Sequence, residues 1–298
     1  CRVERDEANA NLGCGQRVRS GLDGVFSHVD RAIILEDDVD PHPSFFAWAA
    51  HALDRYADRD DVAMIGGHNP LVRWTGVADD GAGFLTRRGG IYGWGTWAWQ
   101  WTSFRETEER HHAPRTEMDL VERDLDPVLH ELMAWYLREA DRLGSNLSWD
   151  VAWSTWMAFE GRSAYVSATN LIHNLGIGPG ATHQHGGHDL LHLLPRLAAG
   201  TAQPGRGPEL GVHDVTFERA RTLLELLVRV EHPAMARRLA RRPNLPIPRE
   251  QRAHLMPFLH ADETGRWLDH LEACGVARET VAVWRRVLGE VPQRPCAS

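Results

Sequence analysis

The sequence predicts an α/β protein with a mostly parallel sheet flanked by helices. Two short apolar runs rich in Ile and Val, at residues 32–35 and 62–67, have the composition of strands buried on both faces. A stretch with apolar residues at helical spacing precedes each run, at residues 15–29 and 44–57. This alternation is typical of parallel sheets, in which ligands bind beyond the carboxyl ends of the strands.

The following segments extend this pattern. Residues 75–90 predict a glycine-rich loop, and the tryptophan-rich residues 91–101 follow it. Residues 145–161 predict a helix that is entered through Ser148 and has Asp150 in its first turn. A change of composition near residue 200 then predicts a boundary between an α/β domain, residues 1–200, and a helical C-terminal segment, residues 201–298. The segment shows no chemical motif, and we interpret it as a helical cap or an interaction module.

The composition limits the classes of partner and compartment. With 43% hydrophobic and 25% charged residues, the chain of 298 residues resembles an ordinary globular protein. Its net charge of −8 disfavours nucleic acid as a partner. Its 4 cysteines form no CxxC pair, so we expect a reducing compartment and a cytoplasmic location. No run approaches the ~18 apolar residues of a membrane helix, which leaves only peripheral association with a membrane open.

The strand predicted at residues 32–35 ends in three adjacent acids, Glu36, Asp37 and Asp38. Carboxylates that close repel one another unless a cation lies between them. Acids delivered by a strand end suit a hard divalent cation such as Mg²⁺ or Mn²⁺, which prefers oxygen ligands. The alternative is a solvated acidic turn, and the residues alone leave both interpretations open.

Asp150 and Arg17 are candidates for chemistry at helix starts. Asp150 lies between Trp149 and Trp153, and aromatic neighbours disfavour a charged carboxylate, which suits a general base. It is equally an aspartate of the kind that the helix dipole stabilises in a first turn. Arg17, near the start of the first predicted helix, suits contact with a diphosphate or a place on a solvated helix face.

Trp94 and His183 complete the set of candidate residues. Trp94 and the tryptophans that follow it suit stacking on a sugar face, core packing, or both. His183 follows a glycine-rich turn that can bring its imidazole, a common metal ligand, across a site. With His185 and His188 it could instead be a solvated loop residue or part of an all-histidine zinc site, although no established zinc-ligand spacing accompanies the three.

Taken in order, five segments resemble the bacterial nucleotide-diphospho-sugar glycosyltransferases of the GT-A fold, and their order is also similar to the N-acetylglucosaminyltransferase I family. The segments are NLGCGQRVRSGLDGVF (11–26), AIILEDDVDPHPSFF (32–46), GGIYGWGTWAWQW (89–101), SWDVAW (148–153) and NLIHNLGIGPGATH (170–183). The resemblance covers roughly residues 9–230. It implies metal-dependent transfer of a sugar from a nucleotide-diphosphate donor, a UDP-sugar first, to a hydroxyl of a glycan or another acceptor, with inversion.

The resemblance also implies a role for each candidate residue. Asp38 would hold the Mn²⁺ or Mg²⁺ ion that bridges the two donor phosphates, and His183 would close the site over the diphosphate or the metal. Glu36 and Asp37 would contact sugar and ribose hydroxyls, and Trp94 would help to wall the donor sugar. Asp150 would deprotonate the acceptor hydroxyl.

One departure from this family concerns its first strand and helix, which would precede Cys1. We therefore expect an N-terminally truncated domain that lacks the first strand of the fold. Two other classes of function stay open. One is a nucleotide- or carbohydrate-binding pseudoenzyme, and the other is a metal-dependent hydrolase of phosphate esters.

Overall fold

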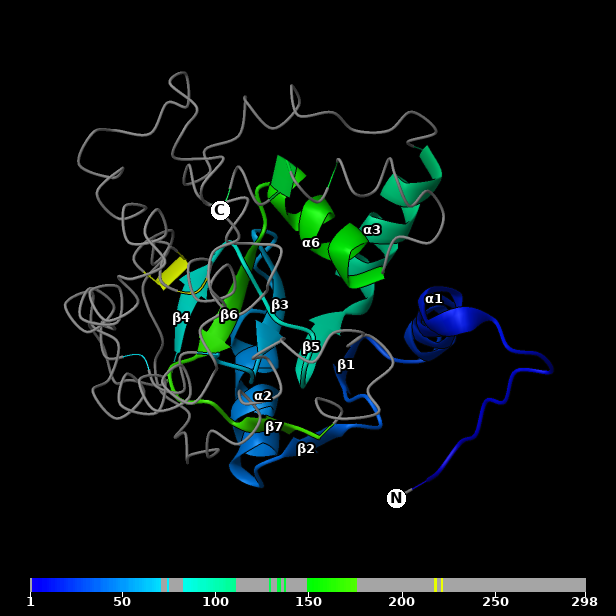
Figure 1. Ribbon diagram of the computed structural model, residues 1–298, viewed down its shortest axis with the longest axis horizontal. Helices are drawn as coiled ribbons and strands as arrows, with labels where there is room; N and C mark the ends of the chain where they lie inside the picture. The colour runs from blue at the N-terminus through cyan, green and yellow to red at the C-terminus, as the bar shows by residue number, and fades with distance from the viewer. Residues whose placement is uncertain are drawn as a thin grey trace, which may run out of the picture.

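The structure, a computed structural model, describes residues 2–70, 74, 83–110, 129, 133, 134, 137, 149–175, 217, 218 and 221. It confirms a mixed α/β architecture in which helices flank a sheet (Figure 1). The described elements, in chain order, are α1 (Gly13–Phe26), β1 (Arg31–Ile34), β2 (Val39–Pro41), α2 (Ser44–Arg55), β3 (Val62–Gly66), β4 (Gly83–Thr86), β5 (Trp94–Trp97), α3 (Ala98–Arg110), α6 (Trp149–Phe159), β6 (Ser163–Ser167) and β7 (Ile172–Asn174).

The main sheet has five strands in the order β1-β5-β3-β6-β4, and β2 and β7 form a separate two-stranded ribbon. β1 and β3 run in the same direction, as expected, but β5 lies between them and is antiparallel to both. β3 pairs with β6 in parallel, and β4 is antiparallel to β6. The expectation of a mostly parallel sheet is therefore wrong for the strand pairings, because three of these four pairs are antiparallel.

Gly95 allows β5 to lie between β1 and β3. A Cβ atom at this position would lie 3.0 Å from the carbonyl oxygen of Ala32 on β1 and 3.3 Å from the side chain of Ile65 on β3. Side-chain hydrogen bonds then fix the strand. The hydroxyl of Thr96 donates to the carbonyl of Ala63 at 2.7 Å, and the indole of Trp97 donates to the carbonyl of Leu53 on α2 at 3.1 Å.

The two strands that the sequence predicted as buried differ in their environment. Every residue of β3 is buried, which confirms the prediction for this strand. β1 has one exposed and three half-buried residues, so the prediction of burial on both faces is wrong there. The reason is its place in the described sheet, where β1 pairs with β5 on one side only.

Part of the predicted glycine-rich loop is a strand. Residues 83–86 form β4, whose four residues are all buried against β6. Gly83 makes this approach possible, because a Cβ atom there would lie 2.5 Å from the ring of Tyr165 and 2.6 Å from the carbonyl oxygen of Val166. The glycines that indicated a loop therefore serve close strand packing.

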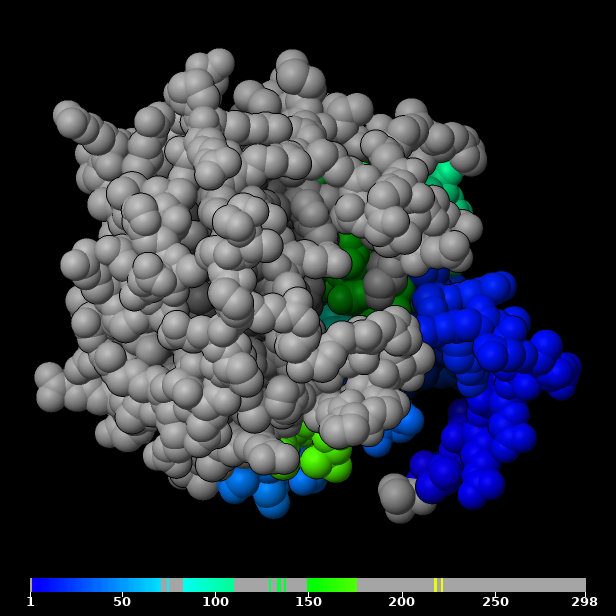
Figure 2. Space-filling view, in the orientation of Figure 1, coloured from blue at the N-terminus to red at the C-terminus, as the bar shows by residue number. Residues whose placement is uncertain are grey.

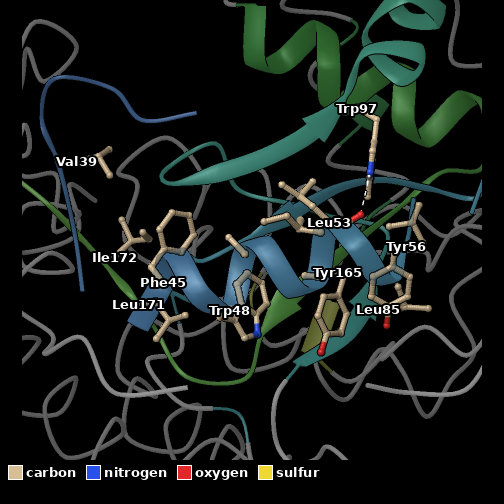
Figure 3. Close-up of a cluster of buried hydrophobic side chains, with 14 residues drawn as sticks. Val39, Phe45, Trp48, Leu53, Tyr56, Leu85, Trp97, Tyr165, Leu171 and Ile172 are labelled. Atoms are coloured by element: carbon tan, nitrogen blue, oxygen red, sulfur yellow. Dashed lines mark hydrogen bonds between the residues drawn. The ribbon is translucent and has the colours of Figure 1, made fainter. Parts of the chain in front are cut away.

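α2 covers one face of the sheet with an aromatic core (Figure 3). The helix begins after Pro43, as predicted, and buries Phe45 and Trp48 almost completely. The ring of Trp48 stacks on that of Tyr165 of β6 with centroids 5.6 Å apart, and Tyr56 packs against the same ring at 4.7 Å. Burial of such aromatic side chains gives this layer much of its stability.

α6 covers the opposite face. The indole of Trp153 points its N–H at the sulfur of Met64, 3.3 Å away, whereas the next residue of β3, Ile65, belongs to the core under α2. Successive side chains of a strand point to opposite faces, so α6 and α2 sandwich β3. α6 also packs against α3 through stacked and edge-on aromatic rings, among them Trp101 and Phe104.

Three described residues of the predicted C-terminal segment lie against the sheet. Phe217 is buried and packs edge-on against Phe84 of β4, with centroids 4.3 Å apart, and against Trp74 at 5.5 Å. The other described residues there are Glu218 and Arg221. The remainder of residues 201–298 lies outside the described part of the chain. Among the described residues of the whole chain, no helix is both long and apolar enough to cross a membrane.

A substitution at Gly67, directly after β3, can test the packing of the core under α2. A Cβ atom there would lie 2.6 Å from the ring of Phe45 and 3.1 Å from Ile172. We expect Gly67→Ala to lower the free energy of unfolding by about 1–3 kcal/mol, the range of core overpacking. Urea unfolding measures this change. The matched control is Gly66→Ala, whose Cβ would meet its neighbours at 3.6 Å and 3.8 Å, and equal loss in both variants would contradict the packing assignment.

Candidate functional site

The chain leaves β1 and β3 at the same edge of the sheet. Ile34 and Gly66, the last residues of these strands, both pair with Trp94, the first residue of β5. The segments that follow Ile34 and Gly66 therefore emerge on the two sides of Trp94. Polar residues in these segments are placed where α/β sheets bind ligands.

The acids after β1 form a tight turn that other elements hold in place. The amide of Val39 donates to the carbonyl of Glu36 at 3.2 Å and closes the turn. β2 then pairs with β7, with Val39 opposite Asn174. The amide of Leu175 donates to the carbonyl of Asp38 at 2.7 Å. The ribbon of β2 and β7 thus fixes the backbone of the turn.

The turn is only partly solvated. Asp37 is exposed, but Glu36 and Asp38 are half-buried. The Oδ1 atom of Asp38 is buried and has no hydrogen-bond partner among the described residues. A buried carboxylate oxygen without a partner is costly, so this atom is suited to a ligand that the chain itself does not supply.

Asp150 lies beside this turn. It occupies the first turn of α6, as predicted from the sequence. Burial raises the pKa of Glu36, and the negative charges of Asp38, Asp150 and Asp37 add to this effect, so that the pKa reaches about 7. Charges act on each other in this way over short distances, so the structure brings Asp150 together with the three acids of the turn.

Trp94 sets the position of Asp150. Its ring is fully buried and stacks on Trp149 at 5.7 Å, and it also packs against Trp153 at 5.5 Å. These two tryptophans flank Asp150 in the sequence. Trp94 is thus a core residue that orients the start of α6.

Cys14, in the first turn of α1, also lies near the cluster formed by Glu36, Asp37, Asp38 and Asp150, although no sequence motif pointed to it. Burial raises the pKa of its thiol, and the negative charges of Glu36, Asp150 and Asp37 raise it further. A usable signal was present, because a helix that precedes a strand in an α/β unit runs antiparallel to it and begins at the carboxyl edge of the sheet. α1 begins at Gly13, so its first turn adjoins the end of β1.

α1, among the blue residues at the right of Figure 2, packs against α6, and the charges of Asp150 at the start of α6 and of Glu36 act on Cys14 at the start of α1. The positive ends of two helix dipoles therefore face the acids and favour negative charge there. Arg17, one turn into α1, forms an ion pair with the exposed Asp6 at 2.7 Å. Arg19 does not face the cluster, since it binds both carboxylate oxygens of Glu108 on α3.

The chemistry of these residues fits a divalent cation held by few protein ligands. Within the described ranges, no group of three or more His, Cys, Asp or Glu side chains is placed to hold a metal ion together. Mg²⁺ commonly uses one or two carboxylates and completes its shell with water and phosphate oxygens. The buried Oδ1 of Asp38 is the best candidate ligand. His183, the other predicted ligand, lies outside the described residues.

No protein-family model matches the chain, and no curated protein matches it. The residues of the chain itself therefore carry the functional argument.

Glu36 gives the cluster a measurable pH dependence. Its carboxyl has a pKa of about 7 in the folded protein and 4.5 as the reference value, so its ionisation destabilises the fold as the pH rises from 4.5 to 7. The full effect would be about 3 kcal/mol, and solvent screening of this partly exposed group reduces it to about 1–2 kcal/mol. We expect Glu36→Gln to be more stable than the parent by that amount at pH 8 and equal to it near pH 4.

Urea unfolding with EDTA at both pH values measures this difference. EDTA keeps divalent cations away from the acids. The control is Asp40→Asn, which removes an exposed charge from β2 next to the turn and should change little at either pH. A gain for Glu36→Gln that is the same at pH 4 and pH 8 would contradict the assignment.

Proposed function

We propose that the chain is a glycosyltransferase domain of the GT-A type that moves a sugar from a nucleoside-diphosphate donor to an acceptor hydroxyl. One observation carries the proposal. Asp150, the residue expected to act as the base, lies close enough to the turn of Glu36, Asp37 and Asp38, the residues expected to bind the donor, for its charge to raise the pKa of Glu36. Asp150 and the acidic turn are far apart in the sequence. An acidic turn that was merely solvated would not need another carboxylate beside it.

The turn would bind the donor. Asp38 would hold Mn²⁺ or Mg²⁺ through its buried Oδ1 atom, and Asp37 and Glu36 would accept hydrogen bonds from ribose and sugar hydroxyls. A bound cation supplies charge neutralisation for a departing diphosphate. The start of α1 would contribute its amide groups and Arg17, whose exposed ion pair with Asp6 is weak enough to exchange for phosphate.

Asp150 would accept the proton of the acceptor hydroxyl. As the proton moves to the carboxylate, the hydroxyl oxygen forms a bond to the anomeric carbon and the bond from that carbon to the diphosphate oxygen breaks. One base opposite one leaving group gives inversion at the sugar carbon. Trp149 and Trp153 fix Asp150 through their packing on Trp94 and exclude water from that side.

The base is tested with Asp150→Asn. We expect transfer to fall by a factor of about 10²–10⁴, the usual contribution of a general base, while donor binding persists. Product formation is followed with a panel of nucleotide sugars and acceptors, and donor binding by calorimetry. The matched control is Glu160→Gln, directly after the last turn of α6, which should keep full activity. Undiminished turnover of Asp150→Asn would overturn the role of the base.

The metal site is tested with Asp38→Ala. We expect the parent chain to bind a nucleoside diphosphate more tightly with Mn²⁺ than with EDTA, and we expect the variant to lose this difference. Calorimetry with UDP and GDP measures the binding of each protein in the presence of Mn²⁺ and in the presence of EDTA. Asp40→Asn is the control for loss of one nearby carboxylate. An unchanged Mn²⁺ effect in Asp38→Ala would remove Asp38 from the site.

A further inference from the structure

The segment that precedes α1 carries an acid that occupies Arg17. Residues 2–12 are all exposed, and Figure 1 shows them as a blue trace without helix or strand that extends beyond α1. Nη1 of Arg17 donates to Oδ2 of Asp6 at 2.7 Å, and Nη2 of the same guanidinium donates to the carbonyl oxygen of Asp6. One guanidinium therefore binds two oxygens of a single residue.

This contact uses the same donors that an arginine offers to a phosphate group. The planar guanidinium fork binds carboxylates and phosphates through two N–H groups at once. Asp6 fills two such positions on Arg17 with one carboxylate oxygen and one carbonyl oxygen. A phosphate group that approaches Arg17 must therefore compete with Asp6 for these donors.

Arg17 lies close to the part of α1 that adjoins the acidic turn. Cys14, three residues earlier, is near enough to Glu36 and Asp150 for their charges to act on its thiol. Residues three apart are neighbours on the surface of a helix, so Arg17 lies next to Cys14 on α1. Asp6 thus engages a cationic group beside the proposed donor site.

The segment is tethered to the helix, and yet its ion pair can open. Oδ1 of Asn11 accepts a hydrogen bond from the amide of Gly13 at 2.9 Å, which joins the end of the segment to the start of α1. A tethered group competes at a high effective concentration. The side chains of Arg17 and Asp6 are 37% and 73% exposed, so water and salt weaken the pair enough for a ligand to displace it.

We propose that residues 2–12 form an autoinhibitory strap, in which Asp6 competes with the diphosphate of a nucleotide ligand for Arg17. The proposal rests on the proposed function, because it takes Arg17 to be a contact of the donor diphosphate. The apparent affinity for the ligand is lowered by the fraction of molecules in which Asp6 occupies Arg17. Release of the strap therefore raises the affinity without any new contact to the ligand.

Asp6→Asn tests the strap, because it keeps the size of the side chain and removes its charge. Calorimetry of the full chain with UDP and with GDP, in the presence of Mn²⁺ and at constant low ionic strength, measures the affinity. We expect Asp6→Asn to bind the nucleotide about two- to sixfold more tightly than the parent, the range for loss of an exposed competing pair.

Two further variants separate the strap from a general effect of charge. Glu7→Gln is the matched control, since it removes the same charge from the next exposed residue of the segment, and it should bind as the parent does. Arg17→Gln should bind the nucleotide more weakly than the parent. In that background Asp6→Asn should change nothing, because the group for which Asp6 competes is no longer present.

Three results would overturn the strap. They are equal affinity of Asp6→Asn and the parent, an equal gain in Glu7→Gln, and a gain from Asp6→Asn that persists in the Arg17→Gln background. Absence of saturable nucleotide binding to both the parent and Asp6→Asn would also overturn it. Transfer assays judge the proposed function separately, so tighter binding by Asp6→Asn without sugar transfer by any of these proteins would support the strap and contradict glycosyl transfer.

Discussion

The packing of Trp94 is the constraint on which the edge of the sheet depends. This residue begins β5, pairs with the ends of β1 and β3, and stacks on Trp149 of α6. The stack is fully buried, so the start of α6 has little freedom to move relative to the sheet. Asp150 is brought to the acidic turn as a result, although its own side chain takes no part in that packing. Aromatic contacts thus fix the position of a charge.

The carboxylates at this edge repel one another, and the fold carries a cost for holding them together. Burial is the main cause of the raised pKa of Glu36, and the charges of the neighbouring acids add the repulsive part of that cost. Part of it is offset by the positive ends of α1 and α6. The tightly packed aromatic layers under α2 and α6 supply the stability that tolerates such a cluster. Repulsion of this kind is common at sites where a bound ligand supplies the opposite charge.

Local sequence signals predicted the elements that local forces determine. The helix after Pro43, the buried strand at residues 62–66 and the entry of Asp150 into α6 follow from turn chemistry and periodicity, and the structure confirms them. The place of β5 could not be predicted in this way, because it depends on the absence of a side chain at Gly95 in a contact between two other strands. The same holds for Gly83, whose role becomes visible only beside Tyr165. Cys14 was missed for a related reason, since the acids that act on it lie far away in the sequence.

The ribbon of β2 and β7 has a consequence for how the protein folds. It pairs residues near the beginning of the chain with residues that follow α6, so its formation requires the closure of a long loop. Contacts of high sequence separation form slowly, and the acids of the turn resist being gathered. Helices such as α2 form through contacts between residues that are close in the sequence, so they can form early in folding. The acidic turn reaches its final shape only when β7 has joined, so assembly of this cluster is a late event in the folding of the domain.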